Sequence, residues 1–148
     1  MMTEHVSVTI TRQDKYRFLV DFGSGIEKAV TDEPAPLGDG AGPSPQQLLA
    51  AAMANCLSAS LVFAIAKFKG DPGRLTTTAL CETARNEQNR LRVTGMSVTM
   101  TLGTAPESLD HLDRALAQFE DFCTVSQSVR AGIPFSVTVK GPDGRLLK

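Results

Sequence analysis

The chain has 148 residues, of which 42% are hydrophobic and 21% charged, and its formal net charge is -1 at pH 7. This length suits one domain, residues 1–148, with a core of its own, and the composition is that of an ordinary globular protein. The balanced charge argues against nucleic acid or an anionic membrane surface as a partner.

The first residues alternate apolar and polar side chains and lack the apolar run of a secretory signal, so we expect none. The three cysteines, Cys56, Cys81 and Cys123, cannot all pair within one chain. Without a secretory signal, thiols of a reducing compartment are favoured over a disulfide scaffold, and we expect a cytoplasmic protein.

The amino-terminal part of the sequence is typical of strands. Period-two alternation over residues 6–10 and 18–22 predicts two strands that form a hairpin. Residues 26–31 predict a weaker third strand. Residues 32–43 are rich in Pro, Gly and Asp and predict a long loop, and a loop of this length in a compact domain is often functional.

A long apolar helix is the central element of the predicted fold. Ser44 suits the N-cap and Pro45 the first helical position, and no charged residue occurs over residues 48–66. A helix that is apolar on nearly all sides lies in a core or in a membrane. Its high alanine content and its asparagine and serine residues favour a buried central helix and no membrane. One sheet covers one face of a helix, so a second copy is expected to cover the remainder in a twofold homodimer.

Gly70, preceded by two lysines in the last turn, is expected to end this helix. Residues 75–84 and 91–102 predict two strands joined by a polar tip at residues 85–90. The second strand changes its apolar phase near Gly95, which predicts a bulge or kink there.

The last third of the chain predicts a second helix that opens at Pro106, a short helix over residues 126–131 and a final strand over residues 133–139. The order of strands, long helix, strands, helices and strand predicts an α+β domain, with a mainly antiparallel sheet wrapped on the central helix. The second helix carries one apolar stripe, formed by Leu109, Leu112, Leu116, Phe119 and Phe122.

Cys56 and Cys123 are the first candidates for chemistry, although a free cysteine also packs as a small hydrophobe. Cys56 lies well inside its helix and needs a nearby guanidinium to lower its thiol pKa. Cys123 precedes a helix start, with Thr124 or Ser126 as the expected cap, and has the better local environment for a lowered pKa. Cys81, in mid-strand, is interpreted as packing.

The sequence gives no sign of a metal or cofactor. His5 and His111 are isolated, and no CxxC occurs. Neither a glycine-rich phosphate loop after a strand nor a G-x-S-x-G motif is present. We therefore expect no metal site and no cofactor.

Two motifs together resemble the OsmC/Ohr family, the osmotically inducible protein C and organic hydroperoxide resistance proteins. They are GPSPQQLLAAAMANC at residues 42–56, which opens the long helix, and FCTVSQSVRAGIPFSVTV at residues 122–139. The order of elements matches along the whole chain, and the GPSP form is similar to the general OsmC-like branch. The resemblance implies an interlocked homodimer with a shared core of two central helices, and a part in the oxidative stress response.

The resemblance also implies a thiol-dependent peroxidase that reduces organic hydroperoxides, with Cys56 as the attacking thiol and Cys123 as the resolving thiol. An external dithiol reductant would reset the pair. On this hypothesis, an apolar substrate pocket favours hydrophobic peroxides over hydrogen peroxide. Its expected lining is Leu49, Met53, Phe119 and Phe122.

One position departs from the family pattern. Strongly active members carry Glu directly after the Pro, and together with an Arg it holds the charge network; this chain has Gln46 there. Gln accepts a hydrogen bond but contributes no charge that would orient a guanidinium. Arg12 and Arg17 are both candidates for that Arg. The alternative function is therefore a stress-associated or ligand-binding dimer with little peroxidase activity.

Overall fold

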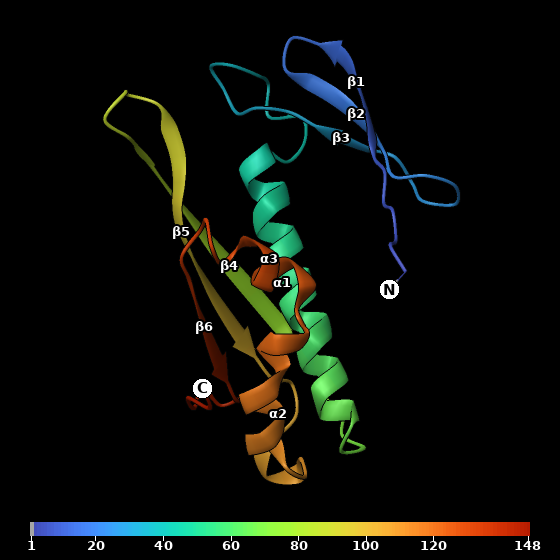
Figure 1. Cartoon of the computed structure of the whole chain (residues 1–148), viewed down its shortest axis with the longest axis vertical. Coiled ribbons are helices and arrows are strands. Elements are labelled where there is room, and N and C mark those ends of the chain that lie inside the picture. Colours follow the sequence, from blue (N-terminus) through green and yellow to red (C-terminus); the bar gives the residue numbers. More distant parts are fainter. Residues whose placement is uncertain (1) are drawn as a thin grey trace. The chain divides into compact units, whose positions relative to one another are not determined.

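The computed structural model describes residues 2–148 and divides into two compact units, Met1–Leu48 and Leu49–Lys148 (Figure 1). The fold is α+β, with a three-stranded sheet in each unit and a long helix. Three of the four strand pairings are antiparallel, in keeping with the predicted class. The strands are divided between two sheets, β1-β2-β3 and β4-β5-β6.

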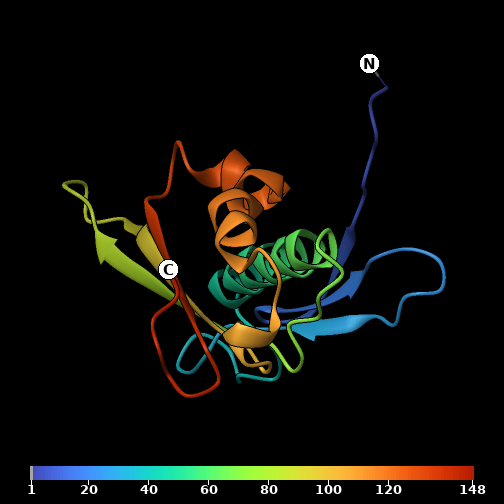
Figure 2. The ribbon, with the colours of Figure 1, turned by 90° about the horizontal axis from the view of Figure 1, so that it is seen from below.

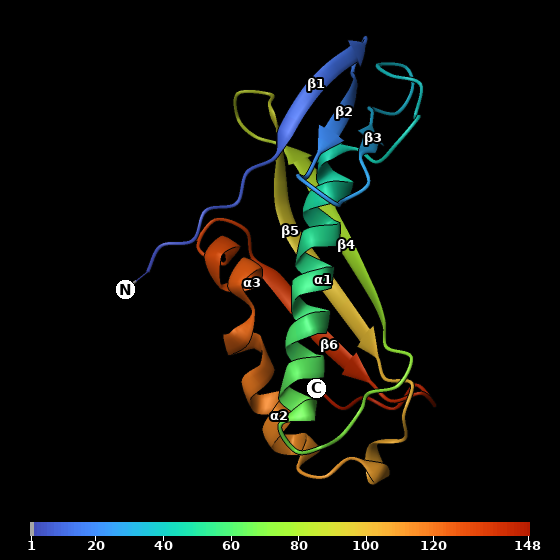
Figure 3. The ribbon, with the colours of Figure 1, turned by 90° about the vertical axis from the view of Figure 1, so that its right-hand side faces the viewer.

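The first unit holds the sheet β1-β2-β3, formed by Thr9–Asp14, Arg17–Asp21 and Ala29–Thr31. Its strands lie side by side in antiparallel order (Figure 3), so the predicted hairpin and the weaker third strand are confirmed. The first strand starts later than expected. Thr9 pairs with Asp21, after which the chain turns, so β2 offers no partner to residues 6–8.

The long helix α1 spans Pro45–Ala66. Ser44 and Gln47 form a reciprocal capping box, in which the Ser44 N–H donates to Gln47 Oε1 at 2.9 Å and the Gln47 N–H donates to Ser44 Oγ at 3.3 Å. The predicted start is thus confirmed. The helix ends earlier than expected, because Lys69, with φ 60°, adopts the left-handed conformation that was expected of Gly70.

In the second unit, β4 (Thr76–Arg85) pairs antiparallel with β5 (Leu91–Thr101), and β6 (Phe135–Lys140) pairs parallel with β5. The bulge predicted near Gly95 is confirmed: the register shifts as the pairing passes from Glu82 opposite Gly95 to Thr83 opposite Val93. The shift returns the apolar residues of β5 to one face.

Between β5 and β6 the chain crosses over through four short helical elements: η1 (Pro106–Ser108), α2 (Leu112–Gln118), η2 (Phe119–Phe122) and α3 (Thr124–Val129). The single second helix expected from the apolar stripe is therefore wrong. The chain is extended at Leu109, and His111 has φ 53°, which breaks the helix before α2.

The core of the second unit lies between α1, the crossover helices and the sheet β4-β5-β6, and all three α-helices lie on one side of that sheet (Figure 2). Only one face of α1 is buried within one chain, and the second copy expected to cover the remainder stays a prediction. Val62 and Phe63 on the other face are 43% and 54% exposed. The residues that α1 buries are Met53, Leu57, Ser60, Leu61, Ala64 and Ile65.

Helix α1 is also long and apolar enough to cross a membrane by length and composition alone. The core helix of a soluble protein passes the same test. Packing of its buried face against β5 and β6 is the arrangement of a core helix.

Candidate functional site

Cys56 lies in the middle of α1 and is half-buried at the wall of a hollow of about 440 Å³. Ala59, Ser60 and Phe63 line the same hollow from α1, and Phe122 lines it from η2. Helical spacings of three, four and seven residues place these α1 side chains on one face with Cys56. The hollow thus brings a thiol and two aromatic rings together.

The two rings of this hollow stack edge to face. The centroids of Phe63 and Phe122 are 5.3 Å apart with an interplanar angle of 83°. Nζ of Lys67 lies 4.4 Å from the Phe122 centroid and 5.2 Å from that of Phe63. The wall is therefore apolar and aromatic, with a cation held on the ring faces.

Cys123 is fully buried at the amino end of α3, where it is itself the N-cap. Its Sγ accepts the Ser126 N–H at 3.4 Å, so the cap expected from Thr124 or Ser126 is corrected. Burial raises the pKa of the Cys123 thiol, and the neighbouring Cys56 raises it further, whereas hydrogen bonds from Ser126 act in the opposite direction. The expectation of a lowered pKa is wrong, because burial of the sulfur outweighs its position at the helix start.

Cys56 packs against the core cluster that contains Cys123, and Phe122, which precedes Cys123 in the chain, lines the hollow at Cys56. The two cysteines come from elements far apart in sequence, α1 and the η2–α3 junction. A dithiol–disulfide couple requires that the Cα atoms of two thiols come within about 7 Å of each other. Both are free thiols in this structure.

Four residues were expected to line a substrate pocket, and the structure separates them. Phe122 lines the hollow at Cys56, 40% exposed. Met53 and Phe119 are fully buried in the core, and Leu49 packs against it. The substrate-pocket role of these residues stays a prediction.

In the first unit, Asp32 organises the loop that leads into α1. Its buried carboxylate accepts the N–H groups of Glu33, Asp39 and Ala41 at 2.8, 3.2 and 3.1 Å. The Ala41 hydrogen bond foremost, then those from Glu33 and Asp39 and the charge of Arg17, holds the Asp32 pKa below its ordinary value. The ionised form of Asp32 is therefore part of the folded loop.

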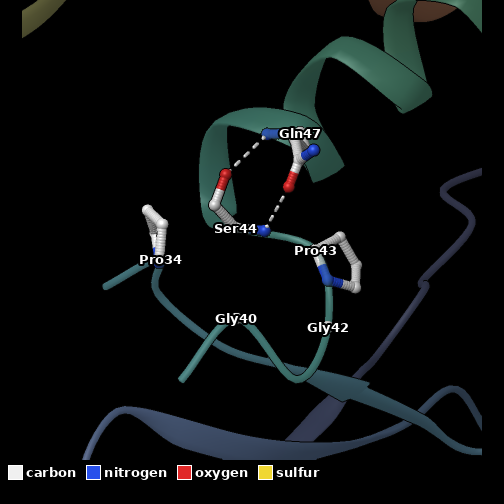
Figure 4. Close-up of a pocket in the computed structure, with 6 residues that line it drawn as sticks. All are labelled: Pro34, Gly40, Gly42, Pro43, Ser44 and Gln47. Atoms are coloured by element: carbon white, nitrogen blue, oxygen red, sulfur yellow. Dashed lines mark hydrogen bonds between the residues drawn. The ribbon is translucent and has the colours of Figure 1, made fainter. Parts of the chain in front are cut away.

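The turn from this loop into α1 lines a second hollow, of about 500 Å³ (Figure 4). Its walls are prolines and glycines of the loop, together with the capping pair Ser44 and Gln47. The capping pair is joined by its own hydrogen bonds, and the hollow contains no cysteine. The hollow at Cys56 is the one that offers a reactive group.

Gln46 lies in the first turn of α1, half-buried. Its Oε1 atom is buried and has no hydrogen-bond partner among residues 2–148. A buried acceptor without a partner costs free energy, so Gln46 is held in its place by the packing around it and not by a hydrogen bond of its Oε1 atom.

The two candidate arginines differ in their surroundings. Arg12 is exposed, and its Nε donates to the Lys15 carbonyl oxygen at 2.8 Å. Arg17 is half-buried, and its Nη2 lies 3.4 Å from Oδ2 of Asp39. The Arg17 Nε atom is buried and, within the described part of the chain, has no acceptor.

Cys81 lies on β4 opposite Met96 and packs half-buried against the core. Over residues 2–148 no group of three or more His, Cys, Asp and Glu side chains has the arrangement of a metal site.

Sequence reasoning missed Phe63 and Glu120 as residues near the cysteines. Phe63 follows Cys56 by two helical turns, and that spacing was the available signal. Glu120 pairs with Lys148, which is distant in sequence, so no local pattern could have indicated it.

Residues 38–138 match the family described as OsmC-like protein. Solved structures are similar over almost the whole chain. The organic hydroperoxide resistance protein OsmC of Legionella pneumophila is 16% identical, with 95% of this chain and 99% of that chain covered and a TM-score of 0.74.

Two further structures extend this comparison. The organic hydroperoxide resistance protein OhrB of Bacillus subtilis is 17% identical, covering 93% and 98% of the two chains with a TM-score of 0.69. An OsmC-like protein of Mycoplasma pneumoniae is 10% identical, with 95% of this chain and 99% of that chain covered and a TM-score of 0.77. At these identities the likeness shows the fold. No curated protein matches the chain by sequence.

Proposed function

The chain belongs to the OsmC-like protein family, and from that premise we propose that it is a thiol-dependent peroxidase that reduces organic hydroperoxides. Cys56 is the attacking thiol and Cys123 the resolving thiol. The observation that supports the proposal is the position of Cys56 at the wall of an apolar hollow that Phe122, the neighbour of Cys123 in sequence, also lines.

The proposed reaction has two steps. The Cys56 thiolate attacks the terminal peroxide oxygen, the O–O bond breaks, and the alcohol leaves after it takes up a proton, so that Cys56 becomes a sulfenic acid. Cys123 then attacks the Cys56 sulfur, and water leaves as the disulfide forms. An external dithiol reduces the disulfide in a cytoplasmic setting.

Arg12 and Arg17 stay the two candidates for the guanidinium of the proposed mechanism. The buried Nε atom of Arg17 is unpaired among the described residues and leaves a donor available, whereas the Nε of Arg12 is already bound to a carbonyl oxygen. Asp39 and Asp32 supply the negative charge beside Arg17 that Gln46 lacks.

A homodimer is the proposed assembly. The face of α1 opposite the core carries Val62 and Phe63 largely exposed, and a second copy would remove such apolar surface from water. Light scattering at low micromolar concentration is expected to report a dimer that persists until the protein unfolds. A folded monomer under those conditions would contradict this assembly.

The alternative is a ligand-binding or stress-associated dimer with little catalysis, and Gln46 is the observation that favours it. Stopped-flow consumption of cumene hydroperoxide by the reduced protein separates the two functions. The peroxidase is expected to consume the hydroperoxide rapidly and to leave a Cys56–Cys123 disulfide, with Cys81 still a thiol in peptide mapping. A disulfide to Cys81, or no consumption above that of free thiol, would contradict the peroxidase.

Gln46→Glu is expected to raise turnover at neutral pH by about tenfold, if some 1.4 kcal/mol of the added charge-assisted hydrogen bond reaches the transition state. A carboxylate at position 46 would hold the guanidinium of the candidate arginine more firmly, and the guanidinium would in turn stabilise the Cys56 thiolate. Steady-state kinetics with cumene hydroperoxide provide the measurement.

The sign of this change is informative. If no guanidinium occupies the site, the new carboxylate destabilises the thiolate and turnover falls. Gln47→Glu is the matched control, because it adds the same charge one residue further along while Glu can still complete the capping box with Ser44. If peroxide turnover falls in Gln46→Glu and the Cys56→Ser variant keeps the protein's function, the binding function would be favoured.

A further inference from the structure

Glu120 lies between two cations in the segment that leads into Cys123. Its Oε2 is 2.5 Å from Nζ of Lys148, and its Oε1 is 3.6 Å from Nη2 of Arg130. The Glu120 side chain is only 20% exposed, so its pair with Lys148 is screened less by solvent than an ordinary surface pair.

The backbone of Glu120 holds the cysteine as well. Its carbonyl oxygen accepts the Cys123 N–H at 3.1 Å and the Gln127 side-chain amide at 3.1 Å. A displacement of Glu120 is therefore transmitted directly to Cys123 and to the helix that Cys123 caps.

Lys148 is anchored to the sheet and to the crossover helices. Its carbonyl oxygen accepts the N–H of Val139 in β6 at 2.9 Å. Its Nζ donates to the Leu116 carbonyl oxygen at 2.7 Å and lies 4.8 Å from the ring centroid of Phe119. The Glu120–Lys148 pair thus ties the η2 segment to the edge of β6.

We propose that the Glu120–Lys148 pair, called here the clasp, positions Cys123 to condense with the sulfenic acid of Cys56. This inference rests on the proposed function and assigns positioning residues to its second step. Neither residue of the clasp touches the reacting sulfur atoms in the proposal, and both act through the backbone of Cys123.

The clasp matters because two reactions compete for the sulfenic acid. In the first, the Cys123 sulfur attacks the Cys56 sulfur, the S–O bond breaks, and the hydroxyl leaves as water with the thiol proton. In the second, another hydroperoxide molecule oxidises the sulfenic acid to sulfinic acid and leaves as its alcohol. A well-placed Cys123 favours the disulfide over this irreversible product.

The test is Glu120→Gln, which removes the charge and retains the shape and the backbone contacts. Disulfide closure is expected to slow by about five- to tenfold, well short of the hundredfold that a misplacement of one ångström costs. The fraction of Cys56 found as sulfinic acid should rise in proportion. The initial oxidation of Cys56 should stay within about twofold of wild type, because the clasp acts after it. Rapid quenching followed by intact-mass measurement reads out all three quantities.

Controls come from the same chain. Glu107→Gln removes an exposed ion pair of similar length, with Arg145 Nη2 at 2.6 Å, and should leave disulfide closure unchanged. Lys148→Met should reproduce Glu120→Gln, and Lys148→Arg should restore wild-type closure. Circular dichroism and thermal unfolding verify that each variant is folded. If Glu120→Gln does not fold, Lys148→Met is used in its place.

Oxidation by diamide separates this inference from the proposed function, since diamide forms the Cys56–Cys123 disulfide without a peroxide. If the wild type consumes no hydroperoxide but the clasp variants still close the diamide-driven disulfide more slowly, the peroxidase fails and the positioning role stands. Closure in Glu120→Gln and Lys148→Met equal to that in Glu107→Gln would overturn the clasp. An equal slowing of the initial oxidation and of disulfide closure would overturn it too.

Discussion

Replacing Cys56 by serine is expected to lower the second-order rate constant for cumene hydroperoxide by about a thousandfold or more. The attacking species is a thiolate, and a serine hydroxyl remains protonated at neutral pH and is a poor nucleophile toward peroxide oxygen. Removal of the nucleophile of a catalytic unit usually costs at least this much. The measurement is stopped-flow consumption of the hydroperoxide by the fully reduced protein.

Two further cysteine variants complete this test. Cys81→Ser should consume hydroperoxide at the wild-type rate, because Cys81 packs against the core on β4. Cys123→Ser should complete the first oxidation and then accumulate the sulfenic and sulfinic acids of Cys56. A Cys56→Ser variant as fast as wild type would exclude the proposed mechanism whatever the other two variants did.

Gly42→Ala is expected to destabilise the protein by about 2–4 kcal/mol and to lower its unfolding midpoint by roughly 5–15 °C. A Cβ at this position would lie 2.0 Å from the Val30 carbonyl oxygen and 2.7 Å from its carbonyl carbon. Both are backbone atoms of β3, so the clash cannot be relieved by a side-chain rotation. Thermal and urea unfolding followed by circular dichroism measure the effect.

The matched control is Gly132→Ala, where the nearest atom to an added Cβ, the Val129 carbonyl oxygen, is 3.9 Å away. It should change the free energy of unfolding by no more than about 0.5 kcal/mol. Equal stability of Gly42→Ala and Gly132→Ala would show that the loop before α1 is not held as closely to β3 as the structure has it.

Local sequence signals predicted those parts of the fold that depend on a few neighbouring residues. The start of α1 follows from Ser44 and Pro45, and Gln47 completes a capping box with Ser44 that the sequence analysis did not anticipate. The β5 bulge follows from the change of apolar phase at Gly95, because only an extra residue can keep one face buried.

Features that depend on distant contacts could not be predicted in this way. The apolar stripe from Leu109 to Phe122 is compatible with one helix or with several, and the break at His111 is a backbone change that the stripe does not encode. Lys69 adopts the left-handed conformation at the end of α1, although the neighbouring Gly70 would adopt that conformation at lower cost and was the predicted position. The two positions lie beside one contact, because the ring centroids of Phe68 and His111 are 5.1 Å apart.

The candidate site shows the same division. The family motifs indicated Cys56 and Cys123, and Cys56 packs against the core that contains Cys123, while their pairing stays a prediction. The direction of the Cys123 pKa shift was missed, because burial of that sulfur is created by elements far from it in sequence. Likewise, the composition of residues 32–43 predicts a loop but not its hydrogen bonds. The Asp32 carboxylate accepts N–H groups as far along the chain as Ala41.

The parallel pairing of β5 with β6 has a consequence for how the protein folds. Strands β4 and β5 close a short hairpin and can form early, whereas β6 can join β5 only after the whole crossover has been traversed. The crossover carries Cys123, and Cys56 lies on the other side of the hairpin in sequence. The two sulfurs therefore meet only late, when the most non-local contacts form. A partly folded chain would hold two separated thiols, so the couple would gain its chemistry only on completion of the native topology.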